Sequence, residues 1–321
     1  MGMNQEGKRG AQVNGQKRHW IAYSVMGVGV LAVSFAAILI KMTSAPASVT
    51  AAYRMWMTVL LLSPFALRGI GPAWRALTGR DKIILGFSGA ALAVHFIFWI
   101  NSLFYTSVAS ATLLLALQPI FALLGAHILF RERVKYSVWL FALIAVIGTA
   151  LIGWRDIRLG GTAAYGDLLA VIGTVAVTAY MLAGQRVRQV MSAMHYSFLV
   201  YVVAGVVLTL YSVARGYSLY EYPASDWRAF ILLALIPTIL GHTLFNTLLK
   251  YLPASTIAMS IVGEPIGATA LAYVIFGDAI PRLWYLGATL VVLGIVLFMR
   301  AAHRSHADRQ GVRSVKPGFT E

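Results

Sequence analysis

The sequence predicts an all-α integral membrane protein in which ten transmembrane helices form two five-helix repeats of inverted topology. Three observations lead to this prediction. The composition is strongly apolar, the apolar residues come in blocks of about one membrane thickness, and the second half of the chain repeats the first.

The composition is not that of an ordinary soluble domain. Of the 321 residues, 59% are hydrophobic and 12% are charged, whereas soluble domains usually carry about 25% charged residues. The chain has no cysteine, which excludes disulfides and thiolate-ligated metal sites. We expect neither a metal nor a cofactor.

The apolar blocks are separated by short polar breaks, and blocks of about 20 residues match the hydrocarbon layer of a bilayer. We expect ten spans with these approximate bounds: 20–40, 48–67, 83–104, 108–129, 136–153, 166–186, 196–214, 229–249, 254–276 and 283–300.

Lys and Arg are distributed unequally between the two sides that these spans define. Ten spans place both termini on one side, which receives two basic tails, 1–19 and 301–321, and the basic turn with Arg131 and Arg133. Because basic loops stay in the cytoplasm, we expect cytoplasmic termini. The formal net charge of +15 is explained by basic residues in cytoplasmic loops and tails, where they set the topology and contact anionic lipids. We therefore expect no nucleic-acid partner.

A constant offset aligns the chain with itself and brings "YTSVASATLLLALQPIFALLGAHILF" onto "YLPASTIAMSIVGEPIGATALAYVIF" without a gap. The aligned pairs include Tyr105/Tyr251, Pro119/Pro265, Gly148/Gly294 and Gly27/Gly173. Each half, 20–153 and 166–300, has five spans, and an odd number inverts the second half in the membrane. Inverted repeats are the usual architecture of secondary transporters, whose substrate site lies near the midplane.

The ninth span contains a single carboxylate, Glu264. Charged residues inside spans usually face a cavity or a partner, and often carry protons or bind cations. Glu264 is therefore a candidate for proton coupling or for binding an ammonium group. A structural carboxyl bonded to neighbouring helices is the alternative. Its repeat mate is Gln118, which is polar but neutral, so only one half holds the charge-sensitive group.

Pro119 and Pro265 lack the amide hydrogen, so the carbonyl groups of Leu115 and Ile261 lose their helical partners. In a membrane these carbonyls must be satisfied by protein or by cavity water. The prolines predict two helix kinks beside a cavity, or alternatively two fixed packing kinks.

Arg54 lies inside the second span, where it either snorkels to the interface or pairs with Glu264 or a substrate carboxylate. His95 and His242 occupy corresponding spans, and a histidine titrates near neutral pH unless it is silently hydrogen-bonded. The remaining candidates for substrate contact, each with helix packing as the alternative, are Trp99, Asn101, Asn246 and Tyr180.

Several stretches resemble the drug/metabolite transporter superfamily, EamA type. "SAPASVTAAYRMWMTVLLL" is similar to the second-helix motif of that family. "FYTSVASATLLLALQPIFALLGAHILFRERVKYSVWLFALIAVIGTALI" is similar to its signature of small residues, a central Pro, a basic-acidic-basic turn and a Gly-containing helix. The second half carries the matching "GDLLAVIGTVAVTAYMLAGQR" and "GEPIGATALAYVIFGD". The resemblance covers about residues 20–300.

The resemblance implies a ten-helix carrier of a bacterial-type inner membrane, with a central cavity lined by helices 1, 3, 4, 6, 8 and 9. Many such carriers export small metabolites, amino acids or drugs, and protons are a candidate coupling ion here. A passive channel and a polytopic membrane enzyme are the alternatives, and the oligomeric state stays open. We expect no catalysis, because the chain has no HExxH pair, paired intramembrane aspartates or P-loop.

Overall fold

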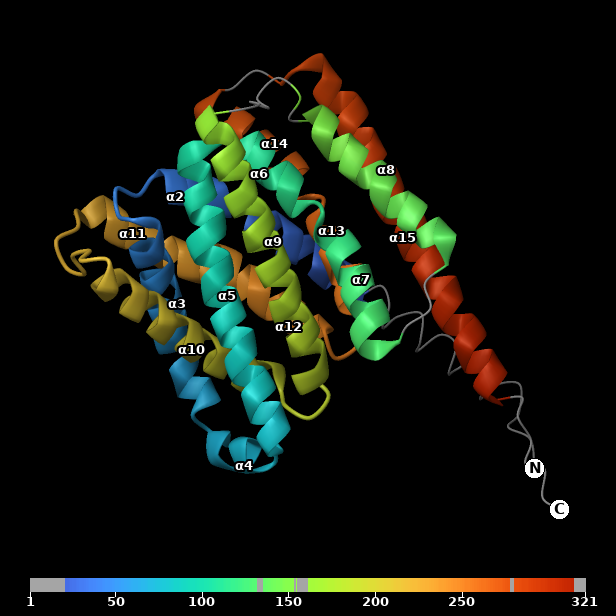
Figure 1. Cartoon of the computed structure of the whole chain (residues 1–321), viewed down its shortest axis with the longest axis horizontal. Helices are drawn as coiled ribbons and strands as arrows, with labels where there is room; N and C mark the ends of the chain where they lie inside the picture. Colours follow the sequence, from blue (N-terminus) through green and yellow to red (C-terminus); the bar gives the residue numbers. More distant parts are fainter. Residues whose placement is uncertain (1–20, 132–134, 153, 155–160, 278–279, 315–321) are drawn as a thin grey trace.

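The computed structural model describes residues 21–131, 135–152, 154, 161–277 and 280–314. Over these ranges the protein is built from helices joined by short connections, with no strand. Most of the helices pack into one bundle, and α8 and α15 lie side by side at its edge (Figure 1).

The helices follow the order of the expected spans. In the first half, helical residues 21–34 lead into α2 (Ala36–Lys41), which is followed by α3 (Ala47–Ala66), α4 (Ile70–Arg75), α5 (Gly79–Tyr105), α6 (Val108–Leu115), α7 (Gln118–Phe130) and α8 (Tyr136–Ile152). The second half contains α9 (Gly161–Val187), α10 (Ala193–Ala214), α11 (Ala224–Leu233), η1 (Ala234–Thr243), α12 (Leu244–Leu248), α13 (Ala254–Ile261), α14 (Glu264–Phe276) and α15 (Arg282–Ser314).

Eight helical stretches among the described residues are long and apolar enough to cross a membrane. They correspond to eight of the ten expected spans. The fifth expected span is α8, an apolar helix of 17 residues. The second is α3, which has 20 residues but contains Arg54 and several hydroxyl side chains. The prediction of an all-α membrane protein is confirmed.

The expected C-terminal tail, 301–321, is helical in its first part, because α15 continues through Ser314. Ala301 and Ala302 favour continuation of the helix, since alanine has the highest helix propensity. Residues 1–19 and 315–321 lie outside the described residues.

The contact between α8 and α15 repeats itself about a pseudo-twofold axis. A Cβ atom on Gly148 would lie 2.7 Å from the carbonyl oxygen of Gly287, and one on Gly294 would lie 2.9 Å from that of Phe141. Gly148 corresponds to Gly294 in the repeat, and Phe141 corresponds to Gly287. The two repeats therefore meet through the same close backbone approach twice, as small residues allow in membranes.

Two glycines bring helices against equivalent aromatic residues, Trp99 and Phe245. The Cβ position of Gly173 on α9 lies 3.0 Å from the Cβ atom of Trp99 on α5. In the first helix, Gly29 makes the corresponding approach to the ring of Phe245 on α12. A Cβ atom on Gly27, the sequence mate of Gly173, would meet nothing within 4 Å.

The two proline-containing spans are broken at equivalent places. The first break separates α6 from α7, and the second separates α13 from α14. The two residues of each break keep right-handed helical dihedral angles, so the α-helical hydrogen bonding is interrupted where the kinks were predicted. Pro119 and Pro265 fall in the first turn of the new helix, where a missing N–H costs nothing.

The eighth span contains a π-helix, η1, which the sequence analysis did not predict. Pro237 lies inside it. π-Helical segments are rare and occur frequently at functional sites. Thr238 and His242 lie in this π-helix, and both belong to the site described below.

Candidate functional site

A cavity of about 40 Å³ lies where the interrupted helices meet. Repeat-related pairs form much of its wall: Phe96/His242, Trp99/Phe245, Leu115/Ile261 and Gln118/Glu264. Because both members of each pair line one space, the cavity lies on the pseudo-twofold axis. Leu115 and Ile261 are the residues whose carbonyls lose a helical partner to the prolines, so the helix breaks face this cavity.

The structure brings six of the nine predicted contact residues to the cavity: Arg54, His95, Trp99, Gln118, His242 and Glu264. Its wall includes all of the helices that the resemblance implied, 1, 3, 4, 6, 8 and 9. Helix 2 joins them through Arg54. The structure does not bring Asn101, Tyr180 and Asn246 to the wall.

Glu264 is the first residue of α14, and its side chain is buried, with 5% of the residue exposed. The N-terminus of a helix stabilises negative charge through its free N–H groups and its dipole. The main-chain carbonyl of Glu264 accepts a hydrogen bond from Ser34 Oγ at 3.2 Å. Within the described part of the chain, its carboxyl group makes no hydrogen bond and no ion pair.

Arg54 is buried inside the bundle, with 1% of the residue exposed, and does not extend to the surface as a snorkelling side chain would. Its Nε donates to Thr238 Oγ1 at 2.7 Å, and its Cζ lies 4.7 Å from the ring centroid of Phe96. That distance is within the range of a cation–π interaction. Thr238 Oγ1 donates onward to the carbonyl of Leu233 at 2.7 Å.

Sequence reasoning missed Thr238. The one signal in the sequence was Pro237 inside an apolar span, because a proline there frees a carbonyl that must find another partner. In the π-helix, the Thr238 hydroxyl lies between the carbonyl of Leu233 and the buried guanidinium of Arg54.

His95 and Trp99 lie on one face of α5, one helical turn apart. The His95 Nδ1 atom is 2.9 Å from the carbonyl oxygen of Gly173. The two rings stack with their centroids 5.9 Å apart and an interplanar angle of 20°. His242 lies across the cavity, with its ring centroid 6.1 Å from that of Phe96.

Gln118 occupies in the first repeat the place that Glu264 occupies in the second, as the first residue of a half-helix. Its Nε2 donates to the Met181 sulfur at 2.8 Å. The neutral member of the pair is therefore anchored to α9, whereas the carboxyl of its mate faces the cavity without such an anchor among the described residues.

Of the three candidates outside the wall, Tyr180 and Asn246 join helices, and Asn101 bonds within its own helix. Tyr180 donates its hydroxyl to Asn246 Oδ1 at 2.6 Å, and Asn246 Nδ2 donates to Ser197 Oγ at 3.0 Å. This chain joins α9, α12 and α10. Asn101 Nδ2 donates to the carbonyl of Ile97 in its own helix at 2.6 Å.

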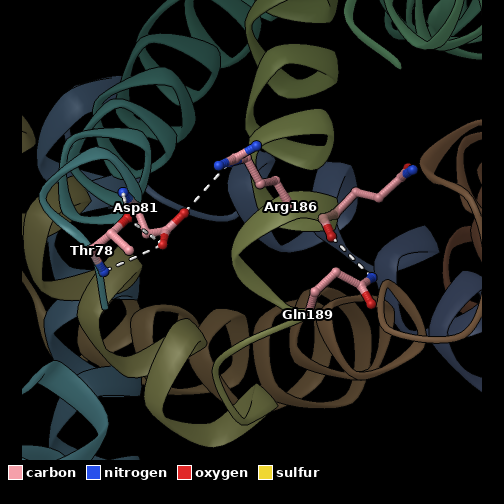
Figure 2. Close-up of polar contacts among 5 residues, drawn as sticks. Thr78, Asp81, Arg186 and Gln189 are labelled. Atoms are coloured by element: carbon pink, nitrogen blue, oxygen red, sulfur yellow. Dashed lines mark hydrogen bonds and ion pairs between the residues drawn. The ribbon is translucent and has the colours of Figure 1, made fainter. Parts of the chain in front are cut away.

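A partly exposed ion pair joins the two repeats at the end of the bundle where α5 begins. Thr78 and Asp81 form a capping box at the start of α5, and Arg186 Nε at the end of α9 lies 3.4 Å from Asp81 Oδ1. Figure 2 shows the Arg186 side chain reaching across to Asp81, while Gln189, in the turn after α9, donates to the carbonyl of Gln185. This ion pair joins one helix of each repeat.

A comparable contact lies at the other end of α3, where α11 begins. Asp226, the third residue of α11 as Asp81 is of α5, accepts from Ser44 N at 3.0 Å and from Ser44 Oγ at 2.8 Å. Ser44 follows the end of α2. This contact also joins the two repeats.

The arrangement can exchange a proton and can hold charged or hydrogen-bonding groups in an apolar setting. Of the residues that the structure describes, no group of three His, Asp or Glu side chains has the arrangement to hold a metal ion. Two inverted repeats, broken helices and a polar cavity between them define the class of membrane transporters.

The comparisons identify the family. The model of the EamA-like transporter family matches residues 20–154 and again residues 164–300. The chain belongs to this family, and the expected membership in the drug/metabolite transporter superfamily is confirmed.

Relatives span most of the chain. An uncharacterized transporter of Bacillus subtilis, YyaM, is 25% identical over 266 residues, which cover 78% of this chain and 83% of the relative. An uncharacterized transporter of Archaeoglobus fulgidus is 22% identical over 247 residues, covering 77% and 84%. A solved crystal structure has a TM-score of 0.71 at 18% identity, covers 88% of this chain and 98% of its own, and supports the fold.

Proposed function

We propose that this membrane transporter is a secondary carrier that exports a small metabolite, amino acid or drug by alternating access through the central cavity. The size of the cavity is the observation that supports the proposal most. At about 40 Å³ it holds about three water molecules, so a substrate enters only if the surrounding helices move. A passive channel would instead need a continuous pore.

The polar contacts at the two ends of α3 fit this mechanism. Asp81–Arg186 and Asp226–Ser44 each join the third residue of a helix in one repeat to a helix end in the other. Breaking one contact while the other is kept would open the cavity to one side only. Both contacts are made in this structure, and the cavity between the repeats is small.

Glu264 is proposed as the proton-coupling group. Glu264 supplies the carboxyl group of the cavity wall, and it is the first residue of a half-helix. Among the described residues, none forms a hydrogen bond or an ion pair with this carboxyl group. A carboxyl in such a place changes charge without breaking an existing hydrogen bond. We propose no catalytic step.

The distribution of Lys and Arg supports an orientation in the bacterial-type inner membrane with both termini in the cytoplasm. The repeats, 20–153 and 166–300, would then be flanked by cytoplasmic basic tails. An impermeant thiol reagent tests this on single-cysteine variants at Ser218 and at a terminal position, because the chain has no cysteine of its own.

The transport experiment uses the full chain in proteoliposomes with a panel of labelled amino acids and cationic drugs, with and without a pH gradient. We expect saturable flux, trans-stimulation by unlabelled substrate, and loss of the pH dependence in Glu264→Gln. Glu221→Gln is the matched control, because Glu221 is an exposed carboxylate between α10 and α11. Flux that does not saturate would favour a channel, and unchanged pH dependence in Glu264→Gln would remove the coupling role.

A further inference from the structure

Two buried N–H donors in the wall of the cavity have no hydrogen-bond partner. They are Arg54 Nη2 and Trp99 Nε1, in residues that are 1% and 3% exposed. In the described part of the chain, only one other buried side-chain nitrogen or oxygen is unpartnered, Trp284 Nε1 on α15. Buried polar atoms are nearly always hydrogen-bonded, so two exceptions in one small cavity require an explanation.

Both donors are held in place by their surroundings. The Arg54 guanidinium is fixed by Thr238 Oγ1 on one side and by the ring of Phe96 on the other. Trp99 packs its Cβ atom against Gly173 and stacks its ring on His95. Neither side chain can turn away to another partner without losing these contacts.

Both groups are hydrogen-bond donors only. An indole N–H and a guanidinium donate hydrogen bonds and accept none. A buried guanidinium also needs a negative charge close by. The Glu264 carboxyl lines the same cavity and interacts electrostatically with Arg54, but no described carboxylate lies within ion-pair distance of the guanidinium. The ligand that satisfies both groups is an acceptor with negative charge.

We propose that Arg54 and Trp99 form an anion subsite that binds the carboxylate of the transported molecule. The inference rests on the proposed function, in which this cavity carries the substrate, and names the substrate class. Arg54 supplies the charge and one N–H, and Trp99 supplies a second N–H. Val33, Val177 and Phe245 in the same wall would contact an apolar organic group once the helices have moved to admit it, which favours an organic acid over an inorganic oxyanion.

The test compares acids with amides of the same shape on the purified full chain. The probes are 4-methylpentanoate with 4-methylpentanamide, 3-phenylpropanoate with its amide, and L-leucine with L-leucinamide, each titrated by thermal shift. Inorganic phosphate is a separate arm. We expect at least one acid to bind about tenfold or more tightly than its amide, because a hydrogen bond to a charged group is worth about that factor.

Trp99→Phe removes the N–H and keeps an aromatic ring. We expect it to weaken binding of the acid about tenfold and to leave the amide unchanged. Trp56→Phe is the matched control, because Trp56 Nε1 already donates to Thr209 Oγ1 at 2.9 Å outside the cavity. Arg54→Gln should abolish the preference for the acid. If that variant does not fold, Trp99→Phe and the wild-type acid–amide ratio still decide the question.

The anion subsite is wrong if acids and amides bind equally, if no acid in the panel binds, if phosphate alone binds, or if Trp99→Phe affects both members of a pair alike. Saturable, Glu264-dependent flux of a neutral or cationic solute without acid preference would overturn the subsite and leave the carrier proposal intact. Absence of saturable flux for every probe that binds would instead count against the carrier.

Discussion

Gln118 and Glu264 are equivalent residues of the two repeats that meet at one cavity. Each is the first residue of the half-helix that follows a break. The two half-helix N-termini therefore face the same space, and only one of them carries a carboxyl group. This single chemical difference divides an otherwise symmetric site into a charge-sensitive half and a neutral half.

Moving the carboxyl group from position 264 to position 118 tests whether the two positions are equivalent. In the double variant Gln118→Glu, Glu264→Gln, the N-terminus of α7 offers the new carboxylate the same stabilisation that α14 offers Glu264. We expect the pH dependence that Glu264→Gln loses to return, with a flux within about tenfold of the wild type, which corresponds to a change of about 1.4 kcal/mol in the barrier. Initial rates as a function of pH measure it. A folded double variant as insensitive to pH as Glu264→Gln would contradict the equivalence.

The ion pair between Asp81 and Arg186 predicts how easily one end of the bundle opens. Val177→Cys places a reporter thiol in the cavity wall of a chain with no other cysteine. We expect Arg186→Gln to raise the labelling rate of that thiol by an impermeant reagent about two- to fivefold, because partly exposed ion pairs contribute up to about 1 kcal/mol.

The control is Gln189→Ala, which removes a side chain in the turn after α9 that bonds back to the carbonyl of Gln185 and should leave the labelling rate unchanged. Equal labelling in Arg186→Gln and in its parent would mean that this pair does not hold the end closed.

The close approach of α8 and α15 predicts a stability effect at Gly148. A methyl group there would meet the backbone atoms Gly287 O and Val291 N, both at 2.7 Å, and backbone cannot move aside as a flexible side chain can. We expect Gly148→Ala to destabilise the protein by about 1–3 kcal/mol. Thermal denaturation in detergent, followed by tryptophan fluorescence, is the measurement.

Gly27→Ala is the matched control, because its methyl group would meet nothing within 4 Å. Alanine has the higher helix propensity, so this change should be neutral or stabilising by up to about 1 kcal/mol. Equal behaviour of the two variants would show that the helices have room to adjust.

Arg131 and Gly277 are repeat mates that end α7 and α14 in the left-handed conformation, with φ of 53° and 73°. This region costs a residue with a side chain about 1–2 kcal/mol, and costs glycine nothing. We expect Arg131→Gly to raise the stability by about 1 kcal/mol and Gly277→Ala to lower it by a similar amount, measured by the same denaturation. Shifts of the same sign in both variants would exclude this explanation.

Much of the fold followed from patterns along the chain. Apolar blocks of bilayer length predicted the spans, and the pairing of Pro119 with Pro265 predicted the repeat. Glu264, His95 and Gln118 were identifiable because a polar group in an apolar block stands out. The structure interrupts the α-helical hydrogen bonding at the two places that the prolines predicted, and how the two half-helices pack there depends on distant parts of the chain.

The sequence by itself determined that the chain enters a membrane, that it is a doubled five-helix unit and that one carboxylate lies in its ninth span, because hydrophobicity and periodicity are properties of neighbouring residues. Tertiary structure decided that Arg54 is buried against Phe96 and Thr238, that Tyr180 and Asn246 bond to each other, and that Gly29 makes the close contact in the first helix. Those outcomes depend on which faces of distant helices meet, and a π-helix or an irregular turn rotates a face without changing the apolar pattern.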